Sequence, residues 1–257
     1  TETAFEKKRA QAEGNMLAAA SGDRRARVSR TGLGGKGPQV FLYKHLRETF
    51  RQNRLGFLNS YMVITALIVT FLALFVPEAM NVIIVLQVVM WIQIFMIGTG
   101  RGMLETYTHY VYMMPGSAFS KLLWSNMEMM VRTLVEAVLF FAIPGLIAGN
   151  NPAVILGAMA VYLSFSLMLL GVNYLSMRYL QANISQGILI MFYFLFTLIL
   201  IAPGLAAALA IGFWVGGLSG SLLGLTILTV WNMLIALISF ALARGFLHNV
   251  DMPTAKA

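Results

Sequence analysis

The sequence of 257 residues contains no cysteine, which excludes disulfides, thiolate metal ligands and cysteine nucleophiles. Charged residues are also scarce, at 11%, whereas an ordinary soluble domain has about 25%. The three histidines, His45, His109 and His248, are far apart and lack the spacing of metal ligands. The sequence shows no cluster of nucleophile, acid and base, so we expect no catalytic, cofactor or metal site in this chain.

Hydrophobic residues, in contrast, make up 59% of the chain, and the mean hydropathy is +0.77. Each crossing of a bilayer needs about 20 apolar residues. Six segments meet this requirement, and they are residues 56–76, 79–99, 127–147, 154–175, 184–202 and 221–242. The sequence therefore predicts an all-α integral membrane protein, in which residues 55–249 form a domain of six transmembrane helices.

The basic residues are unevenly distributed, and twelve of the 18 lie before Leu55. The loops after the second and fourth segments and the tail at 250–257 also carry Lys or Arg, whereas the three opposite loops carry none. Because loops rich in Lys and Arg stay in the cytoplasm, both termini are predicted to be cytoplasmic. The chain starts at Thr1 rather than Met, and we expect it to be part of a longer polypeptide.

Residues 1–37 are predicted to be a basic cytoplasmic helix followed by a glycine-rich linker. Within the linker, Gly32, Gly34 and Gly37 match G-x-G-x-x-G, but no strand precedes them and Pro38 follows. A phosphate-binding loop needs a strand before it and a helix N-terminus after it. The glycines therefore indicate a hinge rather than a nucleotide site.

Residues 38–54 have the pattern of an amphipathic helix. Leu42, Leu46 and Phe50 share one face at spacings of four residues. A second stripe is basic and consists of Lys44, Arg47, Arg51 and Arg54. This pattern predicts a helix at the membrane surface, with its apolar side in the acyl region and its cations at anionic headgroups. The alternative is a helix packed on a protein partner.

Few ionisable residues fall in the predicted spans. Glu128, Arg132 and Glu136 follow one another at i, i+4 and i+8, so they share a face and can pair. They form either an internally neutralised ladder or, through Glu136, a conduit or gating element. A polar stripe on the fourth span consists of Tyr162, Ser166 and Asn173. Such a stripe lines a polar path or joins helices by hydrogen bonds.

The region before the last span is too long for a single crossing. Pro203–Gly204 offers a break, so residues 205–217 are predicted to dip back into the membrane as a re-entrant segment. Glycine also repeats every four residues here, at Gly212, Gly216, Gly220 and Gly224. Small residues at this spacing let helix backbones approach closely.

The loop over residues 101–126 is the longest one predicted on the cytoplasmic side. It contains Glu105, three tyrosines and Pro115–Gly116, and a new helix is expected from Ser117, which can cap it. The tyrosines are Tyr107, Tyr110 and Tyr112. A structured loop of this kind is typical of a docking element for a cytosolic partner, and the alternative is an aromatic belt at the membrane interface.

This loop and the amphipathic helix resemble the permease subunits of bacterial ABC exporters. In those permeases the loop between spans two and three begins with a Glu, and a Pro and then a helix bearing a Lys follow. Glu105, Pro115 and Lys121 fill these positions, with Thr106–Tyr107 where Gly-Thr is usual. The stretch RTGLGGKGPQVFLYKHLRE followed by six spans is similar to the C-terminal half of the putative ABC exporter family.

The resemblance implies a transmembrane permease subunit, or half of one, in an ATP-driven exporter of the bacterial plasma membrane. A separate ATPase subunit would hold the ATP and Mg, so this chain would not be an enzyme by itself. The residues in contact with the ATPase would be Glu105, Tyr107, Tyr110, Pro115 and Lys121. The other partners would be a second six-helix half and anionic lipids.

Three other functions remain possible from the residues. A secondary transporter or channel needs ionisable groups or broken helices near mid-membrane, and Glu136 is the candidate. A membrane-embedded enzyme needs a polar catalytic cluster, which the sequence lacks. A scaffold subunit without transport activity is the third. Nucleic acid is not an expected partner, because the basic segment leads directly into a span.

Overall fold

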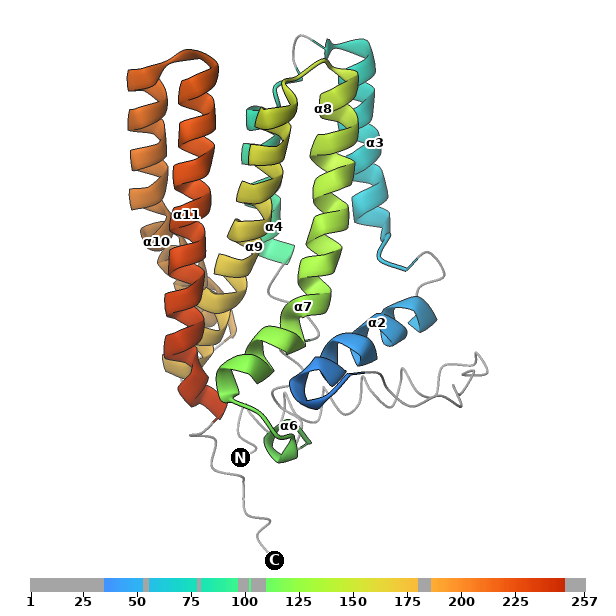
Figure 1. Ribbon diagram of the computed structural model, residues 1–257, viewed down its shortest axis with the longest axis vertical. Coiled ribbons are helices and arrows are strands. Elements are labelled where there is room, and N and C mark those ends of the chain that lie inside the picture. Colours follow the sequence, from blue (N-terminus) through green and yellow to red (C-terminus); the bar gives the residue numbers. More distant parts are fainter. Residues whose placement is uncertain are drawn as a thin grey trace, which may run out of the picture.

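The computed structural model describes residues 35–52, 56–77, 80–96, 102, 110–179 and 186–247 of the chain. All regular structure in these ranges is helical, as predicted, and most helices run side by side along one axis (Figure 1). Some of the predicted elements and residues lie outside the described residues. These are the N-terminal helix and most of the glycine linker, Arg54, Glu105, Tyr107, the side chain of Tyr110, and the tail at 250–257.

The first two helices of the bundle are short and begin at asparagine caps. α3 (Ser60–Phe75) is capped by Asn59, whose side chain accepts a 2.8 Å hydrogen bond from the Met62 amide. α4 (Val82–Met96) is preceded by Asn81, which accepts a 2.9 Å bond from the Ile83 amide. These bonds satisfy amides that a helix start leaves without partners.

The third predicted span is longer than expected. α7 (Ala118–Ala137), the π-helical segment η4 (Val138–Ala142) and α8 (Ile143–Ile147) form one continuous helix of 30 residues. It begins where the sequence predicted a new helix, because Ser117 accepts a 3.3 Å bond from the Ser120 amide. The helix expected in the loop and the span expected at 127–147 are therefore a single element.

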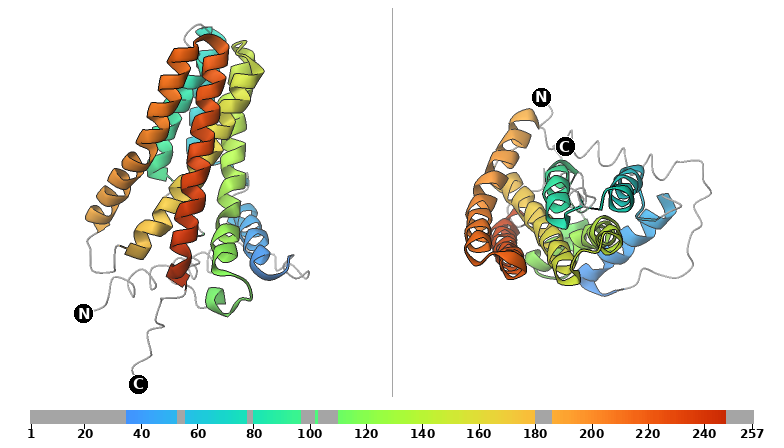
Figure 2. Two further views of the ribbon diagram at one scale, coloured as in Figure 1. Left: turned by 60° about the vertical axis from the view of Figure 1, so that its left-hand side comes forward. Right: turned by 90° about the horizontal axis from the view of Figure 1, so that it is seen from above.

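α9 (Pro152–Tyr179) is the central helix of the fold. It packs against α11, α7, α4 and α10, and it is the most deeply buried of the four long helices. Seen from above, α9 lies between α11 on one side and α7 on the other (Figure 2). Large side chains such as Tyr162, Phe165 and Tyr174 are at most 1% exposed.

The predicted re-entrant segment is wrong. α10 (Gln186–Val215) runs through Pro203 without a break, and a tight turn at Gly216 leads into α11 (Gly217–Ala243). The indole Nε1 of Trp231 donates a 2.9 Å hydrogen bond to the carbonyl of Leu200, in the turn that precedes the proline. This bond ties α11 to the turn of α10 in which proline weakens the helical ladder.

The glycine repeat joins α10 to α11, as its spacing predicted. A Cβ atom on Gly220 would clash with the carbonyl oxygen of Gly212, and one on Gly224 would lie 3.0 Å from the carbonyl of Ala208. Gly216 and Gly217 have φ of 68° and 57°, so glycine is required at the turn itself. The small residues therefore permit a close antiparallel hairpin.

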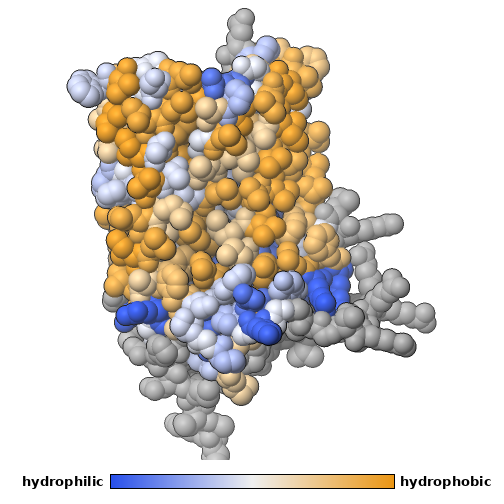
Figure 3. Space-filling view, viewed as in Figure 1, coloured by the Kyte–Doolittle hydropathy of each residue, from blue (hydrophilic) through white to orange (hydrophobic). Residues whose placement is uncertain are grey.

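Among the described residues, four helices are long and apolar enough to cross a membrane, and they span Ala118–Ile147, Pro152–Ser176, Met191–Val215 and Gly217–Ala243. Two further apolar helices, at Ser60–Phe75 and Val82–Ile94, are shorter. Hydrophobic residues cover the length of the bundle, and hydrophilic ones gather at the end that carries α2 and α6 (Figure 3). We call this end the α2 end.

Four shorter elements of the described chain lie at the α2 end of the bundle. A 3₁₀ turn, η1 (Gly37–Gln39), leads into α2 (Val40–Gln52), which lies crosswise below α3 and beside α7 (Figure 1). α6 (Tyr110–Met113) is a single turn before α7, and η5 (Arg244–Leu247) follows α11.

Candidate functional site

The amphipathic helix α2 packs on α7 through a face that differs from the predicted apolar stripe. Phe41, His45 and Thr49 are all less than 9% exposed and lie at spacings of four residues. The hydroxyl of Thr49 donates a 2.9 Å hydrogen bond to Oε1 of Glu128 in α7. The predicted stripe lies one residue further round the helix, and its Phe50 is 60% exposed. We define Phe41, His45, Thr49 and Glu128 as the α2–α7 junction.

The segment before α2 also contacts the turn before α7. A Cβ atom on Gly116 would lie 2.7 Å from Cγ of Pro38, and one on Gly37 would lie 3.4 Å from the carbonyl of Pro115. Gly116 has φ of 134°, a conformation that favours glycine. The turn implied by the resemblance to bind the ATPase therefore touches the start of the amphipathic helix. Lys121 lies one turn into α7 and is half-buried.

Tyr112 is the predicted loop tyrosine whose side chain the structure describes. It is half-buried and packs against the core cluster that includes Phe41 and Leu122. Burial raises the pKa of its phenol, so the side chain stays neutral. Its contacts help to seat α6 on the base of the bundle.

The interface of α7 with α9 carries three pairs of hydrogen-bonded side chains. Asn126 donates from Nδ2 to the hydroxyl of Tyr174 at 2.8 Å. The hydroxyls of Thr133 and Ser166 are 3.1 Å apart. The hydroxyl of Tyr162 donates to Oε2 of Glu136 at 2.9 Å. The residue numbers rise along α7 as they fall along α9, so the pairs fix an antiparallel register, and we call them the α7–α9 seam.

The carboxylate of Glu136 receives a second bond from its own helix. Nε of Arg132 lies 3.3 Å from Oε1 of Glu136, and the carboxylate side chain is 8% exposed. The predicted ladder is therefore only half right, because Arg132 pairs with Glu136 while Glu128 binds Thr49 of α2. Both oxygens of the buried Glu136 thus have a donor, which offsets the cost of taking its charge out of water.

Aromatic rings from three helices surround this carboxylate. Phe141 and Tyr162 are edge-to-face at 5.4 Å between ring centroids, and Phe140 contacts both Tyr61 of α3 and Tyr162. Tyr61 lies close enough to Glu136 to interact with it electrostatically. The deepest part of the seam is therefore a small polar group enclosed by apolar rings, and it borders the π-helical segment η4.

The structure brings some predicted residues together and leaves others apart. Tyr162 and Ser166 both face α7 in the seam, whereas Asn173 is half-buried on the same helix. Lys44 forms an ion pair with Glu48 within α2 at 3.9 Å. Arg47 and Arg51 lie on the same helix, and Arg51 is exposed.

Sequence reasoning missed four residues that complete these contacts. They are Thr49, Asn126, Thr133 and Tyr174. Asn126 and Thr133 are one heptad apart and precede the noted Glu136, so the polar face of α7 was visible in the sequence. The sequence did not show which helix packs against this face.

Two buried amides in the bundle have no hydrogen-bond partner among the described residues. They belong to Gln93 of α4, which is 3% exposed, and to Asn232 of α11, which is 0% exposed. Gly157 faces Leu225 and Gly171 faces Ser239 across the α9–α11 interface. The same difference in residue number pairs Asn232 of α11 with Ser164 of α9, in the middle of that interface.

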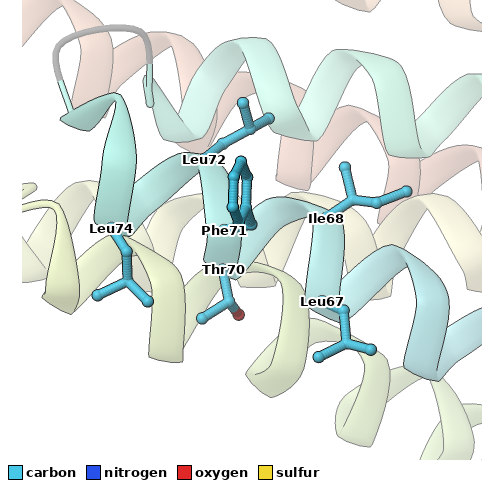
Figure 4. Close-up of a pocket in the computed structure, with 6 residues that line it drawn as sticks. All are labelled: Leu67, Ile68, Thr70, Phe71, Leu72 and Leu74. Atoms are coloured by element: carbon cyan, nitrogen blue, oxygen red, sulfur yellow. The ribbon is translucent and has the colours of Figure 1, made fainter.

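A metal centre and a surface hollow are the other kinds of site to consider in the described ranges. No three His, Asp or Glu residues gather as metal ligands in the described ranges. A shallow hollow on the outer face of α3 is lined by a single helix, and Figure 4 shows its side chains. They are Leu67, Ile68, Thr70, Phe71, Leu72 and Leu74. This apolar face suits acyl chains or another apolar helix better than a polar substrate.

An all-helical bundle with four membrane-length apolar helices, and with its polar residues gathered at one end, defines a multi-pass membrane protein. A family model described as putative ABC exporter matches residues 1–251. The chain therefore belongs to the putative ABC exporter family, as its motifs predicted, and the family indicates an ABC ATPase as the kind of partner. No curated protein and no solved structure gives a significant match.

Proposed function

We propose that this chain is a transmembrane permease subunit, or half of one, of an ATP-driven exporter in the bacterial plasma membrane. In this proposal α3 and α4 are also membrane spans, which gives six, and the α2 end faces the cytoplasm with both termini. A separate ATPase subunit binds ATP and Mg and hydrolyses the nucleotide, so the chain itself is not an enzyme. A second six-helix half completes the transport path.

The observation that carries this proposal is the continuity between the Pro115 turn and the membrane interior. The turn contacts η1 at Pro38, and α7 begins directly after it at Ala118. The same helix then carries Glu128 of the α2–α7 junction and Glu136 of the α7–α9 seam. A displacement of the turn by a bound ATPase would therefore move α2, α7 and α9 together.

The seam supports a packing role better than a conduit. The two side chains of each pair are hydrogen-bonded to each other, and Asn126, Thr133, Tyr162 and Ser166 are at most 2% exposed. A path for water or ions needs polar groups that face an open cavity. In this proposal the seam makes α7 and α9 a rigid unit that moves against the second half.

The test is purification of the full chain from its native membrane in mild detergent, followed by identification of the copurifying chains. The proposal expects a stoichiometric subunit with Walker motifs. Pro115→Ala, in the turn, should then reduce ATPase-driven export from vesicles while the subunits still copurify, whereas Met113→Ala, an exposed neighbour, should not. A pure preparation without an ATPase, but with ion flux in vesicles, would favour the channel instead.

A further inference from the structure

Arg132 is the one ionisable group of the seam region with hydrogen-bonding capacity that the described residues leave unused. Its Nε is taken by Glu136, and no hydrogen bond is formed by its two terminal amino groups in the part of the chain that the structure describes. Its side chain is 27% exposed, in contrast to 8% for Glu136.

The geometry points to a bound phospholipid, and we propose that Arg132 binds the phosphate of an anionic phospholipid at the α2 end of the bundle. A guanidinium presents its terminal amino groups as a planar fork that matches the oxygens of a phosphate. The Nε–carboxylate bond holds this fork in one orientation. This inference does not depend on the proposed transport role.

The depth of Arg132 agrees with a headgroup site. Residues 132 to 147 of the continuous helix cover about 22 Å at a rise of 1.5 Å per residue, and the hydrocarbon core of a bilayer is about 30 Å thick. If Ile147 marks the far edge of the core, the Cα atom of Arg132 lies about 8 Å inside the near edge. An arginine side chain at that depth is long enough to reach the headgroup region.

The surroundings of Arg132 favour a lipid over free phosphate. Tyr61 stands at the start of α3, and its ring packs edge-to-face on Phe140 of the continuous helix that carries Arg132. Ile68 and Leu72 follow Tyr61 at i+7 and i+11, so they lie on the same side of α3, and both line its apolar hollow (Figure 4). A ligand held at Arg132 can therefore place its acyl chain along α3. Free phosphate would gain nothing from these contacts.

The positive charge near the site comes from α2. Arg132 lies between two carboxylates of its own helix, Glu128 and Glu136, which accept hydrogen bonds from Thr49 and from Arg132 with Tyr162 respectively. The adjoining helix α2 carries Lys44, Arg47 and Arg51. Since basic side chains next to a span attract anionic lipid, the α2 end supplies a favourable field for the headgroup.

The test measures phosphatidylglycerol binding to the delipidated full chain by native mass spectrometry. The main variant is Arg132→Gln with Glu136→Gln, which removes the ion pair without leaving a buried charge. We expect its tightest phosphatidylglycerol site to weaken by at least about tenfold, the scale of a lost charged hydrogen-bond pair. Lys121→Gln, which removes a cation nearer the start of α7, should stay within about twofold.

Each outcome decides the proposal. Unchanged binding in the double variant would show that Arg132 only neutralises Glu136 and would overturn it. Displacement of the lipid by excess inorganic phosphate would show that the site recognises a free anion, and would also overturn it. If the double variant does not fold, Arg132→Lys is used in its place. A lysine ammonium that pairs with Glu136 has no planar pair of amino groups left to bind a phosphate. Severalfold weaker binding would support the proposal, and wild-type affinity would contradict it.

Discussion

The hydroxyl of Tyr162 in α9 donates a 2.9 Å hydrogen bond to the carboxylate of Glu136 in α7, inside the apolar part of the bundle. The tyrosine is 1% exposed, and the same carboxylate binds Arg132. A buried carboxylate that loses a donor keeps its desolvation cost without compensation. The hydroxyl of Tyr162 is therefore the atom of the seam whose removal should lower stability most.

Removal of that hydroxyl tests the seam. Tyr162→Phe should lower stability by about 1.5–3 kcal/mol, the range for a hydrogen bond to a charged group. Thermal unfolding of the purified chain in one detergent provides the measurement. Tyr43→Phe, on an exposed part of α2, is the matched control and should leave the unfolding temperature unchanged. Equal unfolding temperatures for wild type and Tyr162→Phe would contradict the seam.

The α2–α7 junction makes a prediction about local dynamics. Thr49→Val keeps the shape of the side chain but removes the donor to the buried Glu128. Amide hydrogen exchange within α2 should then accelerate by about tenfold, as expected for a loss of about 1.4 kcal/mol. Thr226→Val, on an exposed part of α11, is the control. If exchange in α2 is unaffected, the hydrogen bond does not hold the helix on α7.

Two glycines in the hairpin of α10 and α11 should respond differently to substitution by alanine. A Cβ atom on Gly220 would clash with the backbone of Gly212, which cannot move aside, whereas one on Gly212 would lie 3.5 Å from the carbonyl of Gly220. Gly220→Ala should therefore lower stability by about 1–3 kcal/mol, as overpacking does. Gly212→Ala should be neutral or slightly stabilising, because alanine favours a helix by up to about 1 kcal/mol. If Gly212→Ala lowered stability more than Gly220→Ala, α10 and α11 would not approach each other closely at Gly220.

The buried amide of Asn232 predicts a gain of stability. It has no hydrogen-bond partner among the described residues and no exposed surface, so Asn232→Leu should stabilise the isolated chain by about 1–2 kcal/mol. Asn126→Leu is the contrasting variant, since the amide of Asn126 donates to Tyr174 and to the Leu122 carbonyl, and it should destabilise. Destabilisation by both substitutions would mean that Asn232 has a partner in the folded protein.

Much of the fold could be predicted from local sequence signals. Apolar run length predicted a helical membrane protein, and Ser117 predicted the start of α7 because a cap acts within one turn. The small-residue repeat predicted the close approach of two helices around Gly220. Each of these signals depends on neighbours in the sequence, and each was confirmed.

The sequence did not show which helices and side chains pack against one another. Pro203 predicted a break because its local effect opposes a helix, but Trp231 on the next helix contributes a donor to the turn before the proline. The buried face of α2 is set by α7 rather than by the helix's own apolar stripe, so Phe41 and Thr49 were missed. The seam likewise depends on which helix packs against Asn126 and Thr133.

The central claim is that an ATPase subunit binds the turn before α7, and site-specific crosslinking tests it most directly. Because the chain has no native cysteine, Met113→Cys introduces its only thiol at a side chain that is 75% exposed beside Pro115. A photoreactive maleimide at that thiol should crosslink the copurified ATPase subunit on illumination. The same reagent at Leu237→Cys, on the exposed apolar face of α11, should not. An ATPase that copurifies but crosslinks equally from both positions, or from neither, would contradict the account.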